Sequence, residues 1–264
     1  MVSSKSSEEE KRSADASLLL SEIARCPIAK RLCKHPKVGE PCSTIVSTQE
    51  ASSWDGFQVP EPWSGDLVKA RILFLSSNPS INVAETFPKG SWTDAELLDF
   101  FENRFAGHWI RDGKYPRLET GTYGSAVNYW SHIRGRASEL LNDPRPGVDF
   151  VLSEIVHCKS EKERGVEAAL SHCTERYLER LLSCSGASII VLVGRKTLNR
   201  WNELQLGLPK VLEREGADLQ WVAGRKRYCV FLPHPAGFEP RKRFSERISA
   251  SKLNEIRSFL LQKT

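Results

Sequence analysis

Short apolar runs alternate with longer amphipathic segments along most of this chain. Apolar runs of four or five residues that stop at polar or turn residues are typical of buried strands, and apolar residues three or four apart are typical of helices. We predict strands over 71–75, 148–156, 188–194 and 228–232, and helices over 17–33, 128–141, 166–183 and 246–262. Strands that alternate with helices predict an α/β fold, a three-layer α/β/α sandwich with a central four-stranded parallel sheet.

The remaining segments complete the domain plan. Residues 1–16 are rich in Ser, Lys and Glu and lack an apolar signal core, so we predict a disordered tail there. Residues 17–264 are predicted to form a single domain, with an N-terminal helix and loop at 17–65 and an aromatic insertion at 81–125. Inside the insertion, Thr93 and Glu96 have the spacing of a capping box, which predicts the start of a short helix.

Composition narrows the class of protein. The 264 residues carry a net charge of +5, which favours a polyanionic partner. No run of eighteen apolar residues occurs, so we expect no membrane span. Seven cysteines are an odd number in a chain without a secretion signal. A disulfide framework is therefore not expected, and the chain is interpreted as a reduced, cytoplasmic protein.

Two predicted strands end in a polar residue followed by proline. Asn78-Pro79 follows the first strand, and His234-Pro235 follows the last. Because proline cannot continue a strand ladder, each polar side chain lies at the carboxyl end of its strand. Open α/β sheets place their sites at that edge. The sequence therefore predicts a site that combines the Asn78 amide with the His234 imidazole.

These two motifs resemble the signature motifs of the uracil-DNA glycosylase superfamily. Further segments are similar, in the same order, to the iron-sulfur families 4 and 5 of that superfamily, and the similarity runs from about Cys26 to Gly237. They include Lys69–Leu75, Gly135–Leu141 and Val191–Arg195. The resemblance implies a monomeric DNA glycosylase that flips a base out of DNA and hydrolyses its N-glycosidic bond without a catalytic metal.

The chemistry of that reaction suits both residues. Cleavage leaves negative charge on the departing base, which the His234 imidazole can stabilise by donating a hydrogen bond. The Asn78 amide can hold a water molecule against the sugar. Neither motif contains a lysine that could form a Schiff base, so we expect water as the nucleophile and an abasic site as the product. The alternative of another class is a non-catalytic DNA-binding member, which would need neither residue.

Base recognition is predicted for Glu154, Tyr123, Ser76 and Ser77. Glu154 stands where families 1 and 4 have an asparagine that reads uracil, and a carboxylate can only accept hydrogen bonds. It therefore favours a base with an exocyclic amine, such as a modified cytosine, with a defence role against phage DNA as one possibility. Two alternatives stay open: a protonated Glu154 that reads uracil for repair, or a structural contact with a basic neighbour. Tyr123 is expected to stack on the base.

DNA contacts are predicted just after the second motif. Phe238 is a candidate wedge for the gap left by a flipped nucleotide. Arg241, Lys242 and Arg243 follow it and are candidates for phosphate contacts, with a merely solvated surface as the alternative.

The resemblance also implies a 4Fe-4S cluster. Such a cluster needs four thiolate ligands, and we expect four of Cys26, Cys33, Cys42, Cys158 and Cys173 to supply them. The chain departs from the family because Ile23 replaces the first N-terminal cysteine. In the alternative, these cysteines are small apolar core residues. Cys184 and Cys229 are expected in the core.

Overall fold

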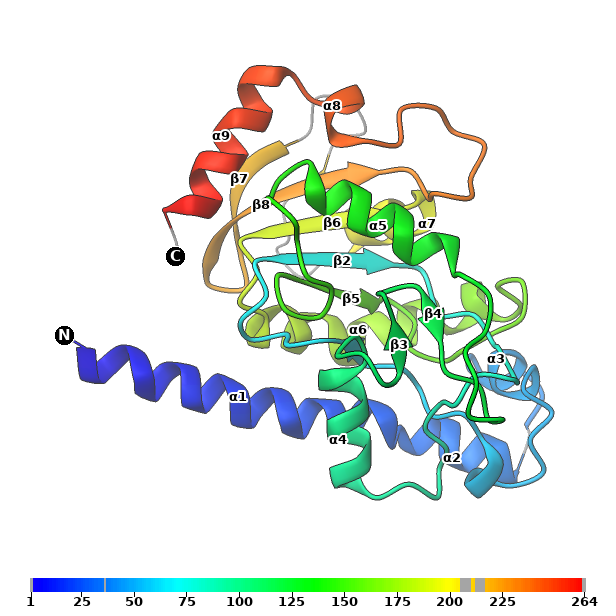
Figure 1. Cartoon of the computed structure of the whole chain (residues 1–264). Helices are drawn as coiled ribbons and strands as arrows, with labels where there is room; N and C mark the ends of the chain where they lie inside the picture. The colour runs from blue at the N-terminus through cyan, green and yellow to red at the C-terminus, as the bar shows by residue number, and fades with distance from the viewer. Residues whose placement is uncertain (1, 36, 205–209, 212–216, 263–264) are drawn as a thin grey trace.

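A mixed six-stranded sheet forms the centre of the protein. The computed structural model describes residues 2–35, 37–204, 210–211 and 217–262, and Figure 1 traces the chain. The strand order is β1-β5-β2-β6-β8-β7. The strands are β1 (Trp63–Ser64), β2 (Ile72–Ser76), β5 (Phe150–Glu154), β6 (Ile189–Val193), β7 (Ala217–Val222) and β8 (Arg225–Leu232).

The predicted α/β class is confirmed, but the predicted four-stranded parallel sheet is not. The four inner strands pair in parallel, and antiparallel β1 and β7 are added at the two edges. The sequence pattern missed the edge strands because β1 has only two residues and because polar Asp218 and Gln220 interrupt the apolar residues of β7, which is exposed between its buried ends. Only strands buried on both faces have a continuous apolar run.

Helices cover both faces of the sheet (Figure 1). Leu73 and Leu75 of β2 pack into a core with one set of helices, whereas Ile72 and Phe74 face the other set. The first set is α1 (Val2–Ala24), α2 (Pro27–Lys34), α3 (Ser43–Ser47), α4 (Asp94–Asn103), α6 (Val166–Cys184) and α7 (Arg195–Glu203). The second is α5 (Asn128–Ser138), α8 (Phe244–Arg247) and α9 (Ala250–Leu261). A 3-10 turn (Trp54–Gly56) and the hairpin β3 (Ile110–Arg111) and β4 (Tyr115–Pro116) complete the described elements.

The prediction of a disordered tail over residues 1–16 is wrong for the residues that the structure describes. Residues 2–16 belong to α1, which continues to Ala24. The Glu, Lys and Arg residues of this segment are good helix formers, and the second half of α1 buries Leu19, Leu20 and Ile23. The helix predicted over 17–33 is divided into α1 and α2, because Pro27 has no backbone N–H to donate into a continuing helix.

Other local predictions agree closely with the structure. Thr93 caps α4 in a capping box with Glu96, as its spacing predicts. The helix predicted over 246–262 is divided into α8 and α9, and Ser249 caps α9. Within the described part of the chain, no helix has the length and apolar character needed to cross a membrane.

The strand register places the ends of four strands at one edge. Ser76 of β2 pairs with Glu154 of β5. Strand β6 lies between β2 and β8 and ends at Val193, and the amide of the next residue, Gly194, donates to the Leu232 carbonyl. The missing Cβ of Gly194 would lie 3.5 Å from the Cβ of His234. Gly194 has φ +88°, a conformation that other residues rarely adopt, so the turn after β6 beside His234 favours glycine.

Candidate active site

A pocket of ≈ 220 Å³ lies at the carboxyl ends of the inner strands. It contains five residues predicted from the sequence: Asn78, His234, Glu154, Ser76 and Ser77. The chain brings them together from three strand ends. The rest of the wall consists of Glu61, Pro79, Ser80, Asn82, Glu85, Arg104, Val127, Tyr129, Trp130, Leu152 and Lys159.

Asn78 has a fixed side-chain amide. Its Nδ2 donates to the Ser160 hydroxyl at 2.8 Å and to the carbonyl of Pro79 at 2.9 Å. Ser160 is buried, and its amide donates to the same Pro79 carbonyl. Because both bonds use the amide nitrogen, they orient the amide oxygen as an acceptor. That oxygen is suited to hold a water molecule.

His234 is held as a neutral imidazole. The Ala236 amide donates to Nδ1 at 3.2 Å, so the ring proton belongs on Nε2. Burial, opposed in part by the carboxylate of Glu163, lowers the pKa of His234 below its ordinary value. The ring stacks on that of Tyr129, with centroids 5.4 Å apart. A neutral imidazole in this tautomer presents Nε2–H as a hydrogen-bond donor.

Tyr129 and Trp130 are aromatic residues of the pocket wall, whereas Tyr123, which was expected to stack on the base, does not line the pocket. The Tyr123 hydroxyl donates to the carbonyls of Gly107 and His108, and the Arg111 guanidinium lies over its ring. Tyr129 instead enters the pocket from the first turn of α5, and its hydroxyl bonds to Ser76. No motif marks Tyr129 in the sequence.

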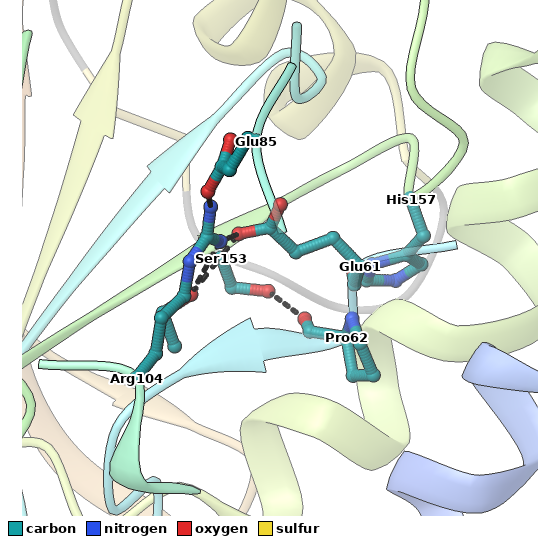
Figure 2. Close-up of polar contacts among 7 residues, drawn as sticks. Glu61, Pro62, Glu85, Arg104, Ser153 and His157 are labelled. Atoms are coloured by element: carbon teal, nitrogen blue, oxygen red, sulfur yellow. Dashed lines mark hydrogen bonds and ion pairs between the residues drawn. The ribbon is translucent and has the colours of Figure 1, made fainter. Parts of the chain in front are cut away.

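A buried group of charges forms one wall of the pocket. Figure 2 shows the Arg104 guanidinium between Glu85 and Glu61. The bond to Glu85 measures 2.8 Å, and a second bond reaches Ser64. Lys159 lies on the same wall, with its ammonium 3.3 Å from the centroid of the Phe87 ring.

Two hydrogen bonds fix the segment that carries Glu61 (Figure 2). Ser153 donates to the Pro62 carbonyl at 2.6 Å, and the Nδ1 of His157 lies 2.8 Å from the Glu61 carbonyl. Sequence reasoning missed this charged wall because its members lie far apart along the chain and belong to no recognisable motif.

Glu154 lies beside this wall and forms no ion pair with any residue that the structure describes. Its Oε2 is buried and has no hydrogen-bond partner among the described residues. Burial and the nearby Glu61 raise its pKa, while Arg104 and Lys159 oppose that shift. Arg104 already bonds to Glu61 and Glu85. Glu154 therefore has an unsatisfied polar atom that a ligand could reach.

Four of the five candidate cysteines line a second, small cavity of ≈ 20 Å³. Cys26 and Cys42 come from the N-terminal caps of α2 and α3, whereas Cys158 follows β5 and Cys173 lies in α6. Cys33 is not part of this wall; its sulfur lies 4.0 Å from the Ala51 carbonyl oxygen.

The residues around this cavity fit an iron-sulfur cluster. Within the described ranges, no group of three or more Cys, His, Asp or Glu side chains is arranged to hold a single metal ion. A four-iron cluster instead binds one thiolate at each of four separated corners. His172 and Tyr177 also line the cavity; the Nε2 of His172 is buried without a hydrogen-bond partner in the described part of the chain, and the Tyr177 hydroxyl lies beside Cys26. Such donors could bond to cluster sulfides.

The remaining cysteines and the predicted DNA contacts lie elsewhere. Cys184 and Cys229 are buried in the core, as expected. Phe238 is fully exposed four residues after His234. Arg241 and Arg243 are also exposed, and the Lys242 ammonium donates to the Pro235 carbonyl at 2.7 Å. These residues form a surface beside the pocket but do not enter it.

No model of a known protein family matches the chain, and a search of curated proteins found no significantly similar sequence.

Proposed function

We propose that this protein is a monofunctional DNA glycosylase that removes a modified pyrimidine and leaves an abasic site. The observation that carries the proposal is the shared pocket of Asn78 and His234. The Asn78 amide oxygen and the His234 imidazole N–H are oriented by separate hydrogen bonds at the ends of β2 and β8. The two residues supply a water-binding acceptor and a donor for a departing base.

The steps follow from these groups. A flipped base enters the pocket, and His234 Nε2–H donates to a carbonyl oxygen of that base. As the N-glycosidic bond breaks, its electron pair goes to the base, whose negative charge the imidazole donor stabilises. Water held by the Asn78 oxygen then adds to C1′ of the sugar, and the proton that it loses passes to the departing base anion, which leaves as the neutral base. Asn78 acts by positioning the water, since an amide is not a strong base.

Lys159 does not alter the assignment of water as nucleophile. It is a lysine of the pocket that sequence reasoning did not consider, and burial lowers its pKa. The carboxylates of Glu85 and Glu61 oppose that shift and favour the ammonium, which is not a nucleophile. We expect no borohydride-trapped adduct between the protein and DNA; a trapped adduct lost in Lys159→Gln would contradict the proposal.

The target base is proposed to be a cytosine derivative. An ionised Glu154 would accept from its exocyclic amine and satisfy the buried Oε2. Because removal of ordinary cytosine would damage the host genome, the base would carry a modification, for example in phage DNA. A role in defence would follow from such specificity.

Uracil excision is the second candidate, and one observation favours it. Burial and the nearby Glu61 raise the pKa of Glu154, which favours the protonated carboxyl. A neutral carboxyl both donates and accepts, like the asparagine it replaces. A protonated Glu154 could therefore pair with uracil in a repair enzyme.

The decisive experiment is base release. The protein would be incubated with genomic DNAs that carry different modified bases, and the released bases would be identified by mass spectrometry. Alkali-labile sites in the same DNA would confirm abasic products. Binding without base release from any of these DNAs, or from uracil-containing DNA, would overturn the enzyme proposal and leave a non-catalytic DNA-binding protein.

We propose a 4Fe-4S cluster held by Cys26, Cys42, Cys158 and Cys173. Burial raises the pKa of Cys42 to about 11 and that of Cys173 to about 12, so the metal-free thiols are protonated. Iron binding would displace those protons. The cluster would tie α2 and α3 to β5 and α6, and it contributes structure here rather than a step of the reaction.

A further inference from the structure

Another pocket, of ≈ 370 Å³, lies beside the pocket that contains Asn78 and His234, which we call the base pocket. One wall comes from α5, and the other comes from the loop after β8. Its lining is Ser131, His132, Gly135, Arg136, Pro235, Pro240, Arg241, Lys242, Arg243 and Glu246. Four cations and one carboxylate line it, and Glu246 already accepts from the Arg243 amide at 2.9 Å. This charge balance suits an anion.

Arg136 gives this pocket an unsatisfied buried donor. The residue is 3% exposed, and its Nη1 is buried without a hydrogen-bond partner among the described residues. Burial lowers the pKa of Arg136 to about 10. An unpaired guanidinium N–H is costly to bury, and an anion oxygen would satisfy it.

The anion pocket and the base pocket share two structural elements. On α5, Tyr129 lines the base pocket and His132 lines the anion pocket; after β8, His234 and Pro235 line one pocket each. Arg136 also donates from Nη2 to the Pro233 carbonyl at 2.7 Å, immediately before His234. One guanidinium therefore contacts both the anion pocket and the backbone that carries the imidazole.

We propose that this pocket binds a backbone phosphate of the DNA strand whose nucleotide enters the base pocket, and that Arg136 couples the phosphate to the position of His234. The proposal rests on the glycosylase function above. The chemistry recognised is that of a phosphate oxyanion, and planar guanidinium groups suit it. Arg136 is a positioning residue because it acts on the reaction through the His234 backbone.

The first test uses the protein without DNA. Inorganic phosphate would be titrated while the ring resonances of His132 are followed by NMR. We expect a saturable shift in the wild type and its loss in the double variant Arg241→Gln/Arg243→Gln, whose side chains are exposed. The control is Lys30→Gln/Lys34→Gln on α2, far from α8 in Figure 1, which removes the same charge and should keep the shift. A shift that never saturates, or one unchanged in the pocket variant, would overturn the site.

The second test uses substrate DNA in which one phosphate at a time is replaced by a neutral methylphosphonate. We expect one linkage near the target base whose neutralisation raises KM on the order of tenfold and also lowers kcat. In Arg241→Gln/Arg243→Gln the KM effect should shrink, and the slope of log affinity against log salt should fall by about 1 for each arginine removed.

The Arg136→Lys variant tests whether Arg136 couples the bound phosphate to the position of His234 or only supports the local structure. It keeps the positive charge but cannot bond to a phosphate and to Pro233 through one planar group. We expect its kcat to become insensitive to the methylphosphonate. A scan with no sensitive linkage, in a protein that does release bases, would overturn this inference alone. Phosphate binding without any base release would keep the anion pocket and remove its coupling to His234.

Discussion

The base pocket and the cysteine cavity both take residues from the end of β5, yet they differ in almost every other property. Glu154 ends the strand in the base pocket, and Cys158 follows it in the cysteine cavity. The base pocket is the larger, at ≈ 220 Å³ against ≈ 20 Å³, and its wall is charged. The cysteine cavity is lined mainly by thiols and apolar groups. The larger volume and the charged wall of the base pocket suit a ligand that enters and leaves. The small, mainly apolar cysteine cavity suits a group that stays bound.

The largest expected effect concerns the proposed iron-sulfur cluster. Anaerobically purified wild type should be brown and carry about four iron atoms per chain. Serine at Cys42, Cys158 or Cys173 should remove the iron and lower the thermal midpoint. Cys33→Ser is the matched control, since Cys33 is buried outside the cavity. Colourless, iron-free wild type would return all five cysteines to the core.

The next largest effect concerns Asn78 and His234 in the base pocket. Alanine at Asn78 or His234 should slow single-turnover base release on the order of 10²–10³-fold, because each residue supplies one transition-state interaction. DNA binding and thermal stability should persist. Asn82→Ala, in the same pocket but outside the motif, should change the rate far less. Full activity in both motif variants would end the glycosylase proposal.

His157 lines the cysteine cavity and bonds to the backbone of Glu61, which lines the base pocket. Its burial predicts that the free energy of unfolding depends on pH. Burial lowers its pKa to about 4, compared with 6.5 in an unfolded chain. The unfolded state therefore binds a proton that the folded state does not, and stability is lost as pH falls from 6.5 toward 4. The loss amounts to about 3 kcal/mol at most. Denaturant unfolding of wild type and His157→Asn at several pH values should show a flatter dependence in the variant; parallel curves would contradict this assignment.

The smallest expected effect distinguishes the two candidate bases. If ionised Glu154 accepts from a cytosine amine, Glu154→Gln should weaken transition-state binding by roughly 1–3 kcal/mol. Activity of the wild type on that base should also rise with pH as Glu154 loses its proton, because its pKa is raised. Glu154→Asn should favour uracil. Efficient uracil release by the wild type, unchanged in Glu154→Gln, would contradict cytosine specificity.

The sequence predicted the strand ends well because their signals are local. An apolar run followed by a polar residue and proline placed Asn78 and His234 correctly, and both line one pocket with Glu154. The charged wall carried no such signal. Arg104 bonds to Glu61 and Glu85 across long stretches of chain, and only the folded structure determines which distant charges become neighbours.

Tyr123 and the N-terminal segment show the same limit. No local pattern distinguishes Tyr123 from Tyr129 in the sequence, whereas the first turn of α5 places Tyr129 in the pocket. The polar start of α1 has the composition of a tail, but the helix continues into a half that packs against α4 and α6. Tertiary packing stabilises helices more than propensity does.

The position of the cysteines along the chain has a consequence for folding kinetics. The segment between Cys42 and Cys158 contains β1, β2 and β5. The two halves of the cavity therefore meet only after a long loop has closed. This closure costs chain entropy before iron binding can offset that cost. We expect iron to enter late, onto a sheet that has already formed. Unfolding in a chelator should accordingly release α2 and α3 before it disrupts β2 and β6.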